Sequence, residues 1–258
     1  GDDANDLIEE IRPAVLTCGF GYALSNVIGK DSVESWGGRA VITCLGDASN
    51  EPSTTKIVAK VYRSGDVLEL CRLAGAASVN PFAKLKLMAD RFLKVADLPG
   101  AIADLGAYRG GTSLILRRLA PRKPLHLFDT WAGNPHDDEL CHHKKGEWAA
   151  TLEDCKFLVG QDELTFYHEG IFPQSVNGHG ADAGMEQFCF VYVDPDTYRS
   201  VRDAIEFFWP KMVEGGEMFF DDYGWQPCAG VKKAVDEAFT ESQRLVFASQ
   251  YSCMVVKR

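Results

Sequence analysis

The sequence predicts an α/β protein with a doubly wound, mostly parallel sheet. From about residue 100 onward, short apolar runs alternate with segments of helical periodicity, which is the pattern of strands joined by crossover helices. Two of these runs, Phe188–Val193 and Met218–Phe220, are short and apolar throughout, so we expect them to be strands buried on both faces. The last two runs are separated only by Tyr251 and Ser252, which predicts an antiparallel edge.

The expected strands each end in a polar or turn-forming residue. AIADLG precedes a glycine-rich turn, LHLFD ends in an acid, and LTFYHEG ends in glycine. FCFVYVD and EMFFDD are the most apolar runs and also end in acids, whereas RLVFASQ and CMVVKR close the chain. These features place seven strands within residues 101–106, 125–129, 164–170, 188–194, 217–222, 244–250 and 253–258.

Helical spacing of apolar residues fills the gaps between these strands. The first helix is stopped by Pro121, and a later one carries Val201, Ile205 and Phe208 on one face, as expected for packing against a sheet. We expect helices over residues 112–119, 147–158, 198–208 and 230–239.

The first 95 residues differ from the rest in their sequence pattern, and we interpret them as an N-terminal extension to a domain over residues 96–258. The extension is expected to hold a short helix over 5–15, ended near Pro13, and helices over 67–77 and 83–96. The β-branched runs 39–45 and 56–63 flank a turn-rich segment, which favours a hairpin. We leave open whether this extension mediates a homodimer or higher homo-oligomer, or closes over a substrate.

Composition narrows the class of protein. The chain has 258 residues, 46% of them hydrophobic, a net charge of -10 and a pI of about 5.1. This argues against nucleic acid or an anionic membrane surface as a partner, because both require a basic face. None of the eight cysteines forms a C-x-x-C pair and the N-terminus is acidic, so we expect a reducing, cytoplasmic location without disulfides. We do not interpret Cys141, His142 and His143 as a metal site, since three adjacent residues converge poorly on one ion.

Two acidic clusters carry the strongest functional signal. Asp194 and Asp196 follow the run FCFVYV, and Asp221 and Asp222 follow EMFF. Open α/β sheets bind ligands at the carboxyl ends of their strands, and carboxylates gathered there repel one another unless a cation lies between them. Oxygen ligands favour Mg²⁺, with Mn²⁺ and Ca²⁺ as alternatives. The alternative interpretation is that individual acids only cap the following helices.

A glycine-rich turn, ADLGAYRGGTS, follows the first strand of the alternating region. Gly106 would allow a sharp turn, Gly110–Gly111 would allow a ligand to approach the backbone, and Thr112 or Ser113 would cap the next helix. Asp129 ends the second strand, where an acid can accept hydrogen bonds from ribose hydroxyls. The turn lacks the G-x-G-x-x-G spacing, so a dinucleotide site of that type is not indicated.

Together these motifs resemble the macrocin O-methyltransferase family, from about residue 98 to the end. The resemblance rests on DLGAYRGGTSLILRRLAP, LHLFDTWAG, HHKKGEW, VDPDTYRSVRDAIEFFWPKMVEGGEMFFDDYGW and GVKKAVDEAF. It implies a Rossmann-like class I methyltransferase fold with a mostly parallel seven-stranded sheet, helices on both faces and a C-terminal antiparallel edge. It also implies S-adenosylmethionine and Mg²⁺ as cofactors and a hydroxylated small molecule, a sugar or another natural product, as substrate.

The resemblance assigns roles to particular residues. Asp194, Asp221 and Asp222 would be the metal ligands, and Asp196 the general base. Asp129 would bind the ribose of S-adenosylmethionine, Glu169 and Gly170 would lie by the adenine, and Arg109 would meet a cofactor carboxylate or only pair with a nearby acid. The full set of expected cofactor-binding residues is Asp104, Gly106, Ala107, Tyr108, Arg109, Gly110, Ser113, Asp129, Thr130, Glu169, Gly170 and Asp194.

Rival functions remain at this point. A catechol-type O-methyltransferase would act on an aromatic diol, and a catalytically silent domain would bind S-adenosylmethionine without turnover. A nicotinamide oxidoreductase is disfavoured by the glycine spacing. The polar stretch NPHDDELCHHKKGE is either a lid over the cofactor or a plain surface loop. Aromatic residues beside the motifs would either wall a pocket or belong to the core: Tyr108, Trp131, Tyr198, Tyr223 and Trp225.

Overall fold

A computed structural model describes residues 15–18, 35, 39–42, 67–178 and 185–258, and the chain divides into two units at Ala76/Ala77. In the first unit, β1 (Val15–Cys18) pairs in parallel with β2 (Arg39–Ile42), and α4 (Val67–Gly75) follows. The expected strand at 39–45 is therefore found over 39–42, but its expected hairpin partner at 56–63 lies outside the described residues. So does the expected helix over 5–15, except for Val15, which begins β1.

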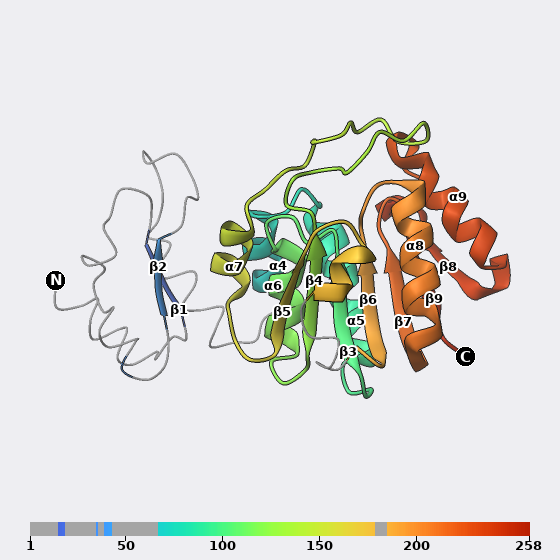
Figure 1. Ribbon diagram of the computed structural model, residues 1–258. Helices are drawn as coiled ribbons and strands as arrows, with labels where there is room; N and C mark the ends of the chain where they lie inside the picture. The colour runs from blue at the N-terminus through green and yellow to red at the C-terminus, as the bar shows by residue number, and fades with distance from the viewer. Residues whose placement is uncertain (1–14, 19–34, 36–38, 43–66, 179–184) are drawn as a thin grey trace. The chain divides into compact units, whose positions relative to one another are not determined.

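The second unit contains a seven-stranded sheet, which confirms the predicted fold class (Figure 1). The strand order is β5-β4-β3-β6-β7-β9-β8; the first five are parallel, and β9 pairs antiparallel with both β7 and β8. The strands are β3 (Ala101–Leu105), β4 (Leu125–Asp129), β5 (Thr165–Glu169), β6 (Phe188–Val193), β7 (Met212–Phe220), β8 (Arg244–Phe247) and β9 (Ser252–Val256).

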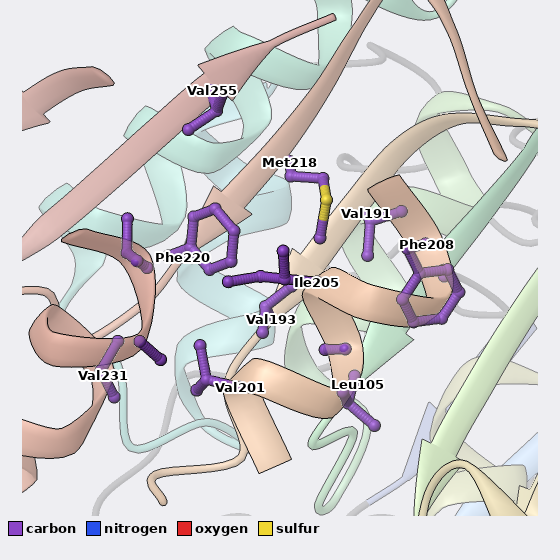
Figure 2. Packing of buried hydrophobic residues seen from close by; sticks show 14 of the residues in the cluster. Leu105, Val191, Val193, Val201, Ile205, Phe208, Met218, Phe220, Val231 and Val255 are labelled. Atoms are coloured by element: carbon purple, nitrogen blue, oxygen red, sulfur yellow. The ribbon is translucent and has the colours of Figure 1, made fainter. Parts of the chain in front are cut away.

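Burial on both faces explains the uniformly apolar strands. Every residue of β3 and β6 is buried. Phe190 of β6 meets Phe92 of α5 (Phe82–Val95) with ring centroids 5.2 Å apart, on one face of the sheet. Val191 and Val193 point to the other face, because side chains alternate along a strand. There they join a core with residues of α8 (Tyr198–Phe208) and α9 (Ala229–Ala238) (Figure 2).

In the unit that contains the sheet, the expected helices are present, with one shifted start. α6 (Gly111–Leu119), α8 and α9 agree with prediction to within one or two residues, as does α5. α7 covers only Leu152–Val159, because Thr151 caps it by accepting from the Asp154 backbone N–H at 3.0 Å. Short 3₁₀ turns occupy Gln174–Gly178, Trp209–Lys211, Gln226–Cys228, Glu241–Gln243 and Ala248–Gln250.

Two further predictions concern the ends of this unit. The connection between the closing strands is longer than expected, because Ala248–Gln250 form a 3₁₀ turn and Tyr251 adopts a left-handed backbone. α5 lies in the unit that contains the sheet, while the predicted domain boundary between residues 95 and 96 stays a prediction.

Among the described residues, no helix is both long and apolar enough to cross a bilayer. Six cysteines whose side chains the structure describes are free thiols: Cys71, Cys141, Cys155, Cys189, Cys228 and Cys253.

Candidate functional site

The two acidic clusters lie side by side at the carboxyl ends of β6 and β7. Val193 is in register with Phe220, and the backbone N–H of Asp221 donates to the Val193 carbonyl at 3.0 Å. Ligand oxygens of Asp194, Asp196 and Asp222 lie within 4.8 Å of one another. Three carboxylates at this separation can hold one oxygen-preferring divalent cation, and therefore fit Mg²⁺, Mn²⁺ or Ca²⁺.

Burial and repulsion from neighbouring acids raise the pKa values of Asp194 and Asp196. Burial, followed by repulsion from Asp221 and Asp222, raises the pKa of Asp194 well above its ordinary value. Burial and then Asp222 raise the pKa of Asp196 to about 6. A positive ion among them would reverse much of this shift, because opposite charges favour the ionised form.

Backbone strain marks the same two strand ends. Asp196 has φ of 58° and Asp222 has φ of 55°, both in the left-handed region that non-glycine residues seldom adopt. Such strain persists only where the surrounding structure holds the residue in place, and it concentrates at functional sites. In this chain it turns both acids out of line with their strands and toward the pocket, which both of them line.

Asp221, the third predicted ligand, is placed differently. It is only 1% exposed and does not line the pocket. The Lys84 ammonium and the Tyr192 hydroxyl both donate to its carboxylate. Asp221 thus lies behind the three converging acids, held by donors of the protein.

Lys84 and Asn80 are members of the site that the sequence interpretation missed. The Lys84 ammonium also lies 3.1 Å from Asp222 Oδ1, and the Asn80 amide donates to the Tyr192 oxygen at 3.1 Å and to Asp194 Oδ2 at 3.4 Å. A signal for Lys84 was present, since it occupies the same helical stripe as Met88 and Phe92, four and eight residues later. A lysine on a buried stripe requires a partner of opposite charge.

The glycine-rich turn between β3 and α6 forms the opposite side of the site. Gly106 has φ of 91°, and a Cβ there would overlap the Asp194 carbonyl, so the glycine lets the ends of β3 and β6 meet. Gly110 serves packing rather than ligand approach: a Cβ there would come within 2.6 Å of Val159 in α7. The approach of a ligand to the backbone is instead open at Gly111, which lines the pocket.

Buried Asp104 and half-buried Asp129 organise this turn. The prediction that Thr112 or Ser113 caps α6 is wrong: the N-cap residue is Gly110, without a side-chain cap, and both hydroxyls instead donate to Asp104 Oδ2. Asp104 is fully buried, which raises its pKa to about 6, and its Oδ1 has no hydrogen-bond partner. Asp129 accepts the backbone N–H groups of Tyr108 at 2.8 Å and Trp131 at 2.6 Å. Each Asp129 oxygen retains a lone pair for a ligand hydroxyl.

A pocket of about 490 Å³ joins the two sides, a volume in the range of small-molecule sites. It is lined by Asp196, Asp222 and several of the predicted cofactor residues: Gly106, Ala107, Tyr108, Asp129, Thr130, Gly170 and Asp194. Five other predicted residues are not part of its lining: Asp104, Arg109, Gly110, Ser113 and Glu169. Arg109 instead lies over the Tyr108 ring at 5.1 Å.

The polar stretch after β4 crosses the carboxyl ends of the strands toward α9 (Figure 1). The His142 backbone N–H donates to the Pro227 carbonyl at 2.7 Å, and Asp138 accepts the Tyr198 N–H at 2.9 Å. His143 lines the pocket, and its ring lies within 4.8 Å of ligand atoms of Asp196 and Cys228. This nitrogen, oxygen and sulfur set would suit Zn²⁺ better than Mg²⁺, and it shares Asp196 with the all-oxygen set.

Aromatic side chains surround the mouth of the pocket. Trp225 and Tyr251 pack edge to face with centroids 5.0 Å apart, and Tyr108 packs against Trp148 at 6.2 Å; all four line the pocket. Of the five aromatic residues singled out from the sequence, Tyr108 and Trp225 therefore line it. Tyr223 belongs to the core and donates its hydroxyl to Asp236 at 2.6 Å.

This strand order, with its pocket at the carboxyl ends of β3, β4 and β6, defines a Rossmann-like class I methyltransferase fold, and solved structures with that fold are similar. One is the O-methyltransferase NovP, with a TM-score of 0.53 at 18% identity, covering 68% of this chain and 78% of that one. Another is CalS11, the calicheamicin methyltransferase, with a TM-score of 0.59 at 17% identity, covering 83% and 99%.

The chain belongs to the macrocin-O-methyltransferase (TylF) family, whose model matches residues 81–246. A curated relative is the 8-demethyl-8-(2,3-dimethoxy-alpha-L-rhamnosyl)-tetracenomycin-C 4'-O-methyltransferase of Streptomyces olivaceus. The two are 25% identical over 150 residues, which is 51% of this chain. The match spans only 56% of that relative.

Proposed function

We propose that this protein is an S-adenosylmethionine-dependent O-methyltransferase that acts on a hydroxyl of a sugar or another polyhydroxylated natural product, with the help of a divalent cation. The observation that carries the proposal is the convergence of Asp194, Asp196 and Asp222 on a pocket that also reaches the β3–α6 turn and Asp129. Family membership supports methyl transfer, and the rhamnosyl group in the name of the Streptomyces relative supports a sugar acceptor.

The pocket offers one end to each reactant. Tyr108, Asp129, Thr130 and Gly170 would bind S-adenosylmethionine, with the unpaired lone pairs of Asp129 on the ribose hydroxyls. Asp194 and Asp222 would hold the cation beside the acceptor. When bound, a divalent cation lowers the pKa of an acceptor hydroxyl and orients it.

Asp196 would act as general base. As the acceptor oxygen forms its bond to the methyl carbon, the bond from that carbon to the sulfonium breaks, and the hydroxyl proton passes to Asp196. Asp196 suits this role because it lines the pocket and its carboxylate lies within 4.8 Å of the ligand atoms of Asp194 and Asp222, beside the acceptor that the cation would hold. Buried walls around the reactants would hold oxygen and methyl carbon close, which removes much of the entropic barrier.

The test is an assay for methyl transfer with and without metal. The protein would be incubated with methyl-labelled S-adenosylmethionine and matched panels of sugar and catechol acceptors, and labelled product would be counted. We expect transfer to at least one sugar hydroxyl, loss of transfer in EDTA and recovery with Mg²⁺. Full activity in EDTA would contradict the metal, and methylation confined to catechols would favour the aromatic-diol alternative. Cofactor binding without transfer to either panel would indicate a silent binding domain.

A further inference from the structure

The surroundings of Asp221 leave little of its carboxylate for a metal. Oδ1 accepts from the Lys84 ammonium and from the Asp222 backbone N–H, the latter at 2.7 Å, while Oδ2 accepts the Tyr192 hydroxyl. Oδ1 therefore accepts two hydrogen bonds and Oδ2 one, and the side chain is fully buried and does not line the pocket. To bind Asp221, a cation would have to displace the buried Lys84 ammonium or the buried Tyr192 hydroxyl.

Lys84 is as firmly held as its partner. Its side chain is 7% exposed and contacts both Asp221 and Asp222. Its ammonium therefore bridges the two carboxylates and fixes the one relative to the other.

We infer that Lys84 and Asp221 form a built-in ion pair that positions Asp222, and that Asp221 is not a metal ligand in this chain. The inference rests on the proposed function and revises the ligand set that the family resemblance implies. Asp194 and Asp222 hold the cation, and Lys84 and Asp221 act through them as positioning residues. Two carboxylate ligands are common for Mg²⁺, and they leave more of its coordination positions for water and for neighbouring hydroxyls of the acceptor.

The test is Mn²⁺ binding to the full chain, measured by the electron paramagnetic resonance signal of free Mn²⁺. The key variant is the double substitution Lys84→Met with Asp221→Asn, because it removes one positive and one negative charge and keeps the local net charge. Asp222→Asn is the positive control for the loss of a ligand. Lys86→Met is the matched control on the same helix, since Lys86 pairs with Asp90 and, within the part of the chain that the structure describes, with none of the acids of the site.

We expect the double variant and Lys86→Met to bind Mn²⁺ within about threefold of the wild type, and Asp222→Asn to lose at least about tenfold. Beside Lys84, the change Asp221→Asn alone should lower Mn²⁺ affinity more than it does in the Lys84→Met background, because it leaves the Lys84 ammonium without its partner next to Asp222. S-adenosylhomocysteine binding, measured by calorimetry, checks that each variant is folded. A double variant that binds S-adenosylhomocysteine but loses Mn²⁺ as fully as Asp222→Asn would overturn the inference.

The proposed function fails in a different way. Wild-type protein that binds no Mn²⁺, or an Asp222→Asn variant with unchanged affinity, would remove the metal itself and the inference with it. If only the double variant and Asp222→Asn lose Mn²⁺ binding, the proposed metal site stands, and Asp221 is one of its ligands. A positioning role also predicts that Lys84→Arg recovers more activity than Lys84→Met, since arginine can still reach two carboxylates with a positive charge.

Discussion

At the scale of single residues, the site separates carboxylates by their surroundings. Asp196 has a pKa raised to about 6, lines the pocket and lies beside Asp222. Asp104 has a similar pKa, but is buried behind the β3–α6 turn among hydroxyl donors. The two acids thus have similar pKa values, but only Asp196 lines the pocket. We therefore expect Asp196 to govern turnover and Asp104 to govern stability.

Asp196→Asn should retain Mn²⁺ and S-adenosylhomocysteine binding while turnover falls by about 10²- to 10⁴-fold, the usual contribution of a general base. In the wild type, turnover should rise with pH as Asp196 loses its proton, with a midpoint below 6 because the bound cation favours the ionised carboxylate, and the variant should lack this rise. Single-turnover rates across pH 5 to 8 measure both effects. Turnover in the variant at the wild-type level would exclude Asp196 as the base.

Asp104 should make the free protein less stable as pH rises. Its folded pKa of about 6 exceeds the ordinary 3.8, so the native state holds a proton that the unfolded chain releases. The stabilisation is complete below pH 4 and is lost as pH rises through 6, amounting to about 3 kcal/mol. Urea unfolding at pH 4 to 8 should show a slope that Asp104→Asn reduces and that the exposed control Glu163→Gln leaves unchanged. Equal slopes in wild type and Asp104→Asn would contradict the assignment.

At the scale of elements, the meeting of strand ends builds the site. The Asp194 N–H donates to the Leu105 carbonyl at 2.8 Å, which ties the end of β6 to β3, just as Asp221 ties β7 to β6. Gly106 makes the first of these contacts feasible. The pocket therefore depends on the close approach of backbones as much as on the acids.

Gly106→Ala should destabilise the protein by more than about 3 kcal/mol and weaken S-adenosylhomocysteine binding, because a methyl group there overlaps the Asp194 carbonyl. Gly146→Ala is the matched control: Gly146 has φ of 84°, close to the 91° of Gly106, but nothing lies within 4 Å of its Cβ position. Gly146→Ala should lower the free energy of unfolding only by the strain of a left-handed backbone at a non-glycine residue, about 1 to 2 kcal/mol. Thermal and urea unfolding measure both, and equal losses would show that the contact with Asp194 is unimportant.

Element types were predictable from the sequence because apolar periodicity is set by burial. The uniformly apolar runs of β3 and β6 reflect cover on both faces, and α8 follows its apolar spacing from end to end. Local chemistry was harder to predict. The start of α7 is delayed because Gly146 and Trp148 adopt left-handed backbones and Thr151 then caps the helix.

The acids of the site were found from the sequence, whereas their partners were not. Sequence position identifies Asp194, Asp196 and Asp222, because they follow strands whose carboxyl ends lie at one edge of the sheet. Lys84 reaches them from a helix more than a hundred residues earlier, and nothing local in the sequence fixes that pairing. The same holds for Thr112 and Ser113, whose hydroxyls turn to buried Asp104 rather than to the helix start.

At the scale of the whole molecule, the pocket draws on segments from Ala77 to Tyr251, so its ligands should stabilise the unit that contains the sheet. S-adenosylhomocysteine at one hundred times its dissociation constant should add about 2.7 kcal/mol, which corresponds to a rise of about 5 to 10 °C in Tm. Differential scanning fluorimetry with a ligand series measures this. A Tm independent of ligand concentration would argue against cofactor binding.

The position of Tyr251 bears on how this scaffold could be diversified. It lies on the short link between the last two strands and, with Trp225, lines the mouth of the pocket, whereas the residues assigned to the methyl donor come from β3, β4 and β5 and the turns that follow them. Altering that link would reshape the entrance without rebuilding the donor half. Under the proposed function, acceptor preference would be separable from methyl transfer, and libraries confined to residues 248–251 would test this by screening for new acceptor hydroxyls.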